Sequence, residues 1–213
     1  MKKNRILYRP YIEMCWNASV SLNTYIFSTF ASLFAYSNGV TNLLGLIFYQ
    51  SFVIMQLIEY FIWTKTFSNR TLSQIALFVV LCQPILNILK IERRPDWIPY
   101  LLVAYFVFIA TLYTVVIPLD TIEFSSTPSK NGHLSWNWFK LNIYAITILY
   151  AFLAVRWIID EMYPTLLFIT SILIVSIILY KETHTWGSMW CWIANALSFY
   201  LIFLVFYKDF CKI

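Results

Sequence analysis

Uncharged hydrophobic stretches divide this chain into segments of the length that a membrane-spanning helix needs. Residues 14–58 contain no Asp, Glu, Lys or Arg, and this run is too long for one helix because about 20 residues cross a bilayer. The turn sequence Ser37-Asn38-Gly39 interrupts the run and predicts two helices there. Each of five further uncharged runs predicts one helix. The seven expected helices cover roughly residues 15–36, 41–64, 71–90, 97–118, 138–159, 163–181 and 190–208.

The connection before the fifth predicted helix is the longest in the chain. Residues 120–140 include the turn pair Asn131-Gly132 and several serines, which predicts an irregular loop. We expect His133 to be solvated in this loop. Trp136 and Trp138 extend the short uncharged run that follows, and they would lie at the membrane interface, where tryptophan is enriched.

Composition agrees with the hydrophobic pattern, because 61% of the residues are hydrophobic and 12% are charged. A soluble domain carries about 25% charged residues, and so little polar surface cannot cover a protein that faces water. This excludes a soluble enzyme, and four scattered cysteines do not form a disulfide framework. We therefore expect an all-α fold, a polytopic bundle of seven transmembrane helices that forms a single integral membrane domain over residues 1–213.

The net charge of +5 is carried by the chain ends and loops, as expected for charges that lie near anionic lipid headgroups. No basic stripe typical of nucleic-acid binding is present, so we expect the lipid bilayer and not a nucleic acid as partner. With seven spans, nine basic residues lie on the face of the N-terminus and six on the opposite face, which favours a cytoplasmic N-terminus. Glycosylation of the triplet Asn69-Arg70-Thr71, on the same face, would reverse this orientation.

Polar residues at helical spacing mark faces that point away from lipid. Such stripes are Asn17, Ser21, Thr24, Ser28 and Ser32 in the first predicted helix, and Cys191, Asn195 and Ser198 in the last. Small hydroxyl groups allow membrane helices to approach closely and to form hydrogen bonds. We interpret both stripes mainly as packing faces.

Glu59 is the acidic residue that is hardest to accommodate in a bilayer. It is the only one between Glu13 and Glu92, and it lies about five residues before the predicted end of its helix. A carboxyl group at this depth must pair with a cation, reach water at the headgroup level or stay protonated. Gln56 lies on the same helical face, one turn earlier. These two residues are the centre of a predicted polar pocket.

Further polar residues converge on the same membrane level, because neighbouring helices alternate in direction. The candidate binding residues are Glu59, Gln56, Asn17, Gln83, Asn195 and Ser188. An alternative is a zinc or copper site formed by Cys15, Cys191 and His184, whose side chains suit these metals although their spacing matches no metal motif. Apart from this alternative we expect no cofactor. The sequence does not decide whether the ligand of the pocket is a small ion or a small molecule, or whether the chain assembles into a homo-oligomer.

Three short segments carry a resemblance to a family. Met14-Cys15-Trp16-Asn17 resembles the Met-Cys-Phe-Ser opening of small uncharacterised multi-pass membrane proteins of bacteria, and the Met-Cys-Trp-Asn form found in large DNA viruses. Gln56-Leu57-Ile58-Glu59 with Trp63 resembles their Gln-x-x-Glu-x-x-x-Trp motif. Gly187-Ser188-Met189-Trp190-Cys191-Trp192 resembles their Gly-Ser-x-Trp-Cys-Phe motif.

The resemblance implies an integral membrane protein of a host or virion membrane, without an assigned activity. It selects Cys15, Gln56, Glu59 and Cys191 as the shared residues. This chain departs from the family in the thirteen residues that precede the Met-Cys pair, and in Tyr60, which replaces a frequent glycine.

The sequence favours a channel or transporter-like membrane protein with a polar intramembrane pocket around Glu59 that opens toward the N-terminal face. The first alternative is a structural or host-interaction membrane protein of a virus. The second is a membrane-embedded metal or redox enzyme, which is less favoured because HExxH and GxSxG motifs are absent and no catalytic residue stands out.

Overall fold

A computed structural model of the chain describes residues 17–93 and 95–210, except for the side chains of 189–191, 209 and 210. The α-helices are α1 (Ala18–Ser37), α2 (Leu43–Thr64), α3 (Asn69–Leu89), α4 (Ile98–Thr111), α5 (Ile143–Ile159), α6 (Tyr163–Tyr180) and α7 (Trp190–Phe210). The shorter elements are the π-helical turn η1 (Leu112–Val116), the 3-10 turns η2 (Leu119–Thr121), η3 (Asn137–Phe139) and η4 (Trp186–Met189), and the strands β1 (Ser126–Pro128) and β2 (Leu134–Trp136).

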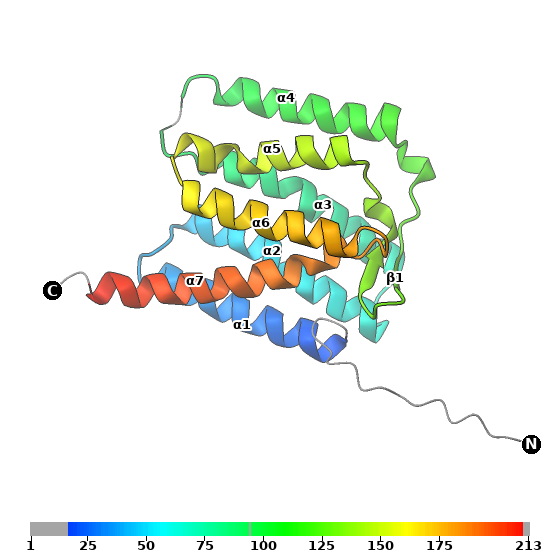
Figure 1. Ribbon diagram of the computed structural model, residues 1–213, viewed down its shortest axis with the longest axis horizontal. Helices are drawn as coiled ribbons and strands as arrows, with labels where there is room; N and C mark the ends of the chain where they lie inside the picture. The colour runs from blue at the N-terminus through cyan, green and yellow to red at the C-terminus, as the bar shows by residue number, and fades with distance from the viewer. Residues whose placement is uncertain (1–16, 94, 211–213) are drawn as a thin grey trace, which may run out of the picture.

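The helices lie side by side along one common direction (Figure 1), with α4 at one edge and α1 at the other. Helix α1 packs against α2 and α7, α2 packs against α3, and α3 packs against α5. We call the end of the bundle that carries the two strands the hairpin end. Helices α1, α3, α5 and α7 begin there, and α2 and α6 end there.

Five helical stretches in the described part of the chain are long and apolar enough to cross a membrane. They are α2, α3, α4 with its π-helical turn, α6, and Trp186–Lys208, which contains most of α7. Large apolar side chains on the outside of these helices are exposed, as lipid-facing positions would be; examples are Phe78, Phe106 and Ile178. The helical fold is therefore confirmed, and its apolar helices are compatible with a multi-pass membrane protein, whereas spans by α5, which is shorter, and by α1 belong to the proposal below.

Asparagine side chains fix where several helices begin. Asn17, Asn42 and Asn142 each precede a helix, and each side-chain oxygen accepts a hydrogen bond from a backbone N–H in the first turn, at 2.8–3.0 Å. Such caps satisfy donors that have no partner within the helix. The predicted turn between α1 and α2 is confirmed, and Gly39 has the positive φ of 66° that glycine adopts without strain.

The segment between α4 and α5 differs from the exposed loop that the sequence predicts. Strands β1 and β2 form an antiparallel hairpin, and His133 is 1% exposed. Trp136 and Trp138 are 3% and 2% exposed, so they are core residues and not part of an interfacial belt or of α5, which begins at Ile143. These predictions were wrong because the aromatic side chains fill the hairpin end of the bundle, where they bury more apolar surface than they would at the interface.

Candidate functional site

Helix α2 carries two of the buried polar side chains of the predicted pocket. Gln56 is 0% exposed and Glu59 is 2% exposed. Neither polar atom of the Gln56 amide has a hydrogen-bond partner among the described residues, and the same holds for Glu59 Oε1. Leaving a buried polar group without a partner costs about 1–3 kcal/mol. The arrangement therefore destabilises the fold unless a proton, ion or small molecule satisfies it.

The unpartnered atoms of α2 form a stripe toward the hairpin end. Trp63 follows Gln56 and Glu59 on the same helical face, since spacings of three and four residues return to one side of a helix. Its indole Nε1 and the hydroxyl of Ser21 on α1 are also buried without a partner among the described residues. Helices α1 and α2 pack against each other, so the structure places this stripe inside the protein and not against lipid.

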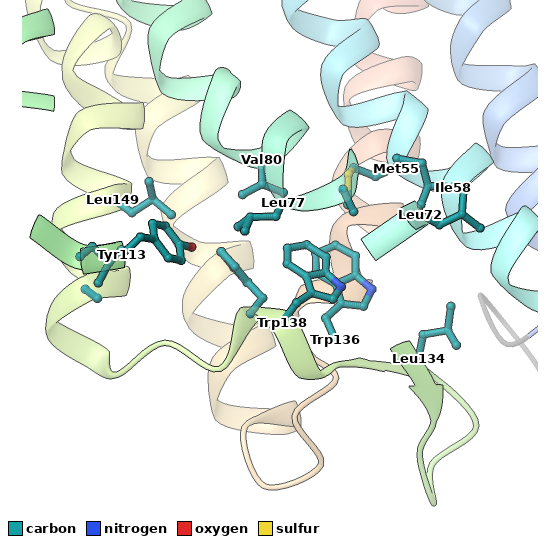
Figure 2. Close-up of a cluster of buried hydrophobic side chains, with 14 of the residues drawn as sticks. Met55, Ile58, Leu72, Leu77, Val80, Tyr113, Leu134, Trp136, Trp138 and Leu149 are labelled. Carbon is teal, nitrogen blue, oxygen red and sulfur yellow. The ribbon is translucent and has the colours of Figure 1, made fainter. Parts of the chain in front are cut away.

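The hairpin covers the acid from the end of the bundle. The indole of Trp136 is hydrogen-bonded to the carboxyl group of Glu59. Trp136 also stacks on Trp138, with ring centroids 4.9 Å apart and planes inclined by 16°. In Figure 2 the two rings lie between the hairpin backbone and the side chains of Met55 and Leu77. We call the hairpin with Trp136 and Trp138 the lid, because it separates Glu59 from the solvent at this end.

Hydrogen bonds to two other segments hold the hairpin in place. The amide of Asn69, the first residue of α3, donates to the backbone oxygen of Ser126 at 2.8 Å and accepts from its backbone nitrogen at 2.9 Å. Asn131 donates to the hydroxyl groups of Thr183 and Thr185, which follow α6, at 3.1 and 2.8 Å. The lid is therefore attached to the first turn of α3 and to the connection between α6 and α7.

Residues of the lid were missed as candidates at the level of sequence. Leu134, Trp136 and Trp138 alternate with Ser135 and Asn137, and such alternation is typical of a strand with one buried face. The alternation was available in the sequence, but the turn residues before it favoured a solvated loop. The buried ring of His133 also belongs to this region and lies edge-on to Tyr180, with centroids 5.5 Å apart.

The other predicted binding residues mainly hold helices or turns together. Asn17 caps α1, and Gln83 Nε2 donates to the backbone oxygen of Ser51 at 3.1 Å. Asn195 donates to the Thr24 hydroxyl at 3.3 Å, which joins α7 to the polar stripe of α1. The Ser188 hydroxyl donates to the backbone oxygen of Thr185 at 2.8 Å within its own turn.

The polar stripe of α1 points inward as predicted. Ser21, Thr24, Ser28 and Ser32 are all buried. Gln50 of α2 donates to the Ser32 hydroxyl at 2.6 Å. Together with the bond from Asn195, this contact shows the stripe joining neighbouring helices, which is the packing role expected from small hydroxyl residues.

Gln83 also lines a partly open cavity beside the hairpin end. This cavity has about 380 Å³ including its mouth and lies between α3, α5 and α6. Phe139 and Trp186 line it at the hairpin end, with ring centroids 5.4 Å apart. Phe139 in turn contacts Trp138, so one aromatic cluster borders both the Gln83 cavity and the Glu59 carboxyl group.

The residues of the metal alternative are only partly described. Cys15 and the side chain of Cys191 lie outside the described residues, and His184 is exposed, with a φ of 53°. Within 17–93 and 95–210, no group of three His, Cys, Asp or Glu side chains could hold a metal ion. A zinc or copper site thus stays a prediction.

Comparison with known proteins gives no match to a family model, to a curated protein or to a solved structure. The resemblance of the three short motifs to a membrane protein family, and with it a viral origin, stays a prediction. Met14, Cys15 and Trp16 of its first motif lie outside the described residues.

Proposed function

We propose that this chain is a channel or transporter-like integral membrane protein with seven spans, in which Glu59 and Gln56 bind a proton or a small cation. The observation that carries the proposal is the burial of the Gln56 carboxamide, which lacks partners among the described residues, beside the Glu59 carboxyl group, one oxygen of which also lacks a partner there. A protonated acid or a bound cation removes the energetic penalty of an isolated buried carboxylate. Ionisable groups inside membrane proteins commonly mark ion or proton pathways.

In this proposal the hairpin is the gate on its side of the membrane. Trp136 contacts the acid directly, and the Trp136–Trp138 stack is continuous with the aromatic rings that border the Gln83 cavity. Movement of these rings away from α2 would open Glu59 to the hairpin end and to that cavity. Such movement would break the hydrogen bonds from Asn69 and Asn131 and expose aromatic rings that are buried in the closed arrangement.

Flux through proteoliposomes tests the proposal. The full chain is reconstituted and the decay of imposed proton, Na⁺ and K⁺ gradients is followed in separate experiments. We expect the wild type to dissipate one of these gradients faster than empty liposomes. Glu59→Gln should slow the decay about tenfold or more, because the neutral amide has nearly the same shape but cannot exchange a proton or neutralise a cation.

The matched control is Glu182→Gln, which changes an exposed carboxyl group in the connection between α6 and α7. It should leave the flux as in the wild type, and size-exclusion profiles should show that both variants fold. A wild type without flux of any of these ions, or a folded Glu59→Gln variant with unchanged flux, would contradict the proposal. A structural role in the membrane would then become the better explanation.

A further inference from the structure

A second cavity lies toward the end of the bundle opposite the hairpin, apart from the Glu59 site. It has about 530 Å³ including its mouth and lies between α2, α5, α6 and α7. Most of its walls are apolar or aromatic, and the polar exceptions include Tyr49, Arg156, Thr165 and Tyr200. A pocket with apolar walls and a cationic group at one side suits an amphiphilic ligand.

A groove on the outside of the bundle shares part of this lining. It has about 520 Å³ including its mouth, and its lining residues come from α6 and α7. Thr165, Leu197 and Tyr200 line both the groove and the cavity. Because these helices would face lipid, the interior cavity adjoins a space that an acyl chain of the bilayer can enter.

Arg156 supplies positive charge at the cavity wall. It is 7% exposed, and its Nε donates to Asp160 Oδ2 at 3.1 Å and to the backbone oxygen of Lys90 at 3.2 Å. The contact of its Nη2 with Glu92 is longer, at 3.8 Å, and the side chain of Glu92 is 81% exposed. A guanidinium group has five N–H donors, so this one has donors left for a further anion.

Lys90 adds a second basic group, which forms no salt bridge with the described residues. Its Nζ lies 5.1 Å from the ring centre of Phe48 and 5.0 Å from that of Tyr49, and both rings line the cavity. Among the residues that the structure describes, no carboxylate lies within 4.0 Å of Lys90 Nζ. Burial, followed by repulsion from Arg156, lowers the pKa of Lys90 to about 7. An anion placed between the two cations would relieve this repulsion.

The depth of these cations matches that of a lipid headgroup. Lys90 directly follows the last residue of α3, and Arg156 lies in the last turn of α5. Helix ends of this kind lie near the membrane interface, where phosphate groups are found. The groove is lined by the first turns of α6, from Pro164 to Phe168, and by Leu197 and Tyr200 of α7.

We propose that this cavity and groove bind one anionic phospholipid of the surrounding bilayer. Its phosphate group lies between Arg156 and Lys90, with the hydroxyl groups of Tyr49 and Tyr200 nearby, and one acyl chain lies in the groove between α6 and α7. The site is independent of the ion-binding role proposed for Glu59, because neither its residues nor its end of the bundle is shared.

Native mass spectrometry of the full chain in detergent tests this site. The protein is mixed with phosphatidylglycerol or with phosphatidylcholine of the same acyl chains. We expect one phosphatidylglycerol molecule to be retained preferentially. Lys90→Gln should weaken its retention about fivefold, since one basic side chain near a membrane surface contributes about that factor. Leu197→Trp, which fills the groove without changing charge, should weaken the retention of both lipids at this site.

Arg93→Gln is the matched control, because Arg93 is a basic residue at the same end but is exposed and pairs with Glu161 at 2.7 Å. It should bind phosphatidylglycerol as the wild type does, and size-exclusion profiles should show that all variants fold. Equal retention of the two lipids by the wild type would overturn the proposal. So would equal losses in Arg93→Gln and Lys90→Gln, which would indicate diffuse attraction to the surface in place of a site.

Discussion

At the scale of single residues, Asn69 shows how a side chain read as a modification signal can have a structural role. Its amide makes two hydrogen bonds with the backbone of Ser126 and thereby substitutes for a strand neighbour of β1. A glycan on Nδ2 would remove one donor hydrogen and require space where the hairpin lies. The folded structure therefore disfavours glycosylation of this triplet, and the cytoplasmic N-terminus stays a prediction from charge.

We predict that Asn69→Ala loosens the hairpin. Both backbone groups of Ser126 would lose their side-chain partner, and the lost stabilisation should be about 1–3 kcal/mol because part of the pair is buried. Hydrogen exchange measured by mass spectrometry should speed up in peptides that cover 122–139. Arg70→Ala, at the exposed neighbouring position, is the control and should exchange as the wild type does. Equal protection in both variants would contradict the anchoring role.

At the scale of elements, the β-hairpin and the turn η4 fit together through one close approach. A Cβ atom on Gly187 would lie 2.5 Å from Cε3 of Trp136 and 2.9 Å from its Cζ3. Both separations are well below ordinary contact between carbon atoms. Glycine at this position thus allows the lid to lie deep enough for Trp136 to reach Glu59.

Gly187→Ala is therefore expected to push Trp136 outward. Overpacking in a closed core costs about 1–3 kcal/mol, so the midpoint of thermal unfolding should fall. The double variant Gly187→Ala/Trp136→Phe replaces the indole by a smaller phenyl ring. It should recover part of the lost thermal stability, as expected for two residues in contact. Glu182→Ala changes an exposed residue of the same connection and should leave the midpoint unchanged. An unaltered midpoint in Gly187→Ala would show that η4 and the hairpin do not pack this closely.

At the scale of the whole molecule, the proposed number of seven spans depends on α5, as it does on α1, because neither helix is among the five stretches of the described chain that are long and apolar enough to cross a membrane. Its 17 residues give a length of about 25 Å, slightly less than the hydrocarbon thickness of about 30 Å. The aromatic segment before it and Arg156 near its end can compensate for the difference, since flanking residues adapt to a short span. Asn87 of α3 donates to the backbone oxygen of Leu153 at 2.6 Å and so joins α5 to a helix that is long and apolar enough to cross a membrane.

Labelling of single cysteines measures whether α5 spans. In a chain without its native cysteines, Lys140→Cys and Glu161→Cys place a thiol before and after α5, at positions that are exposed. With α5 as a span, a membrane-impermeant maleimide added to sealed, uniformly oriented vesicles should label one of the two, and the other only after the vesicles are opened. Glu92→Cys, in the connection after α3, should react like Glu161→Cys. Labelling of both flanking positions from one side would reduce the number of spans.

The sequence alone predicted the helical membrane class, the turn between α1 and α2, and the inward polar face of α1. These features follow from local properties, because hydrocarbon length, turn residues and helical spacing act along one segment. It also predicted Glu59 and Gln56 as the centre of a polar pocket, because a carboxyl group in an apolar helix is unusual wherever its neighbours lie.

Only the tertiary structure decided what surrounds these two residues. Trp136 is separated from Glu59 along the chain by α3, α4, η1, η2 and β1. Its burial depends on the shape of the space that α2, α3 and η4 leave at the end of the bundle. The same holds for Gln83 and Asn195, whose amides bond to neighbouring helices. Packing is a property of surfaces brought together from distant segments, so the identity of a residue sets its chemistry, while the fold sets its partner.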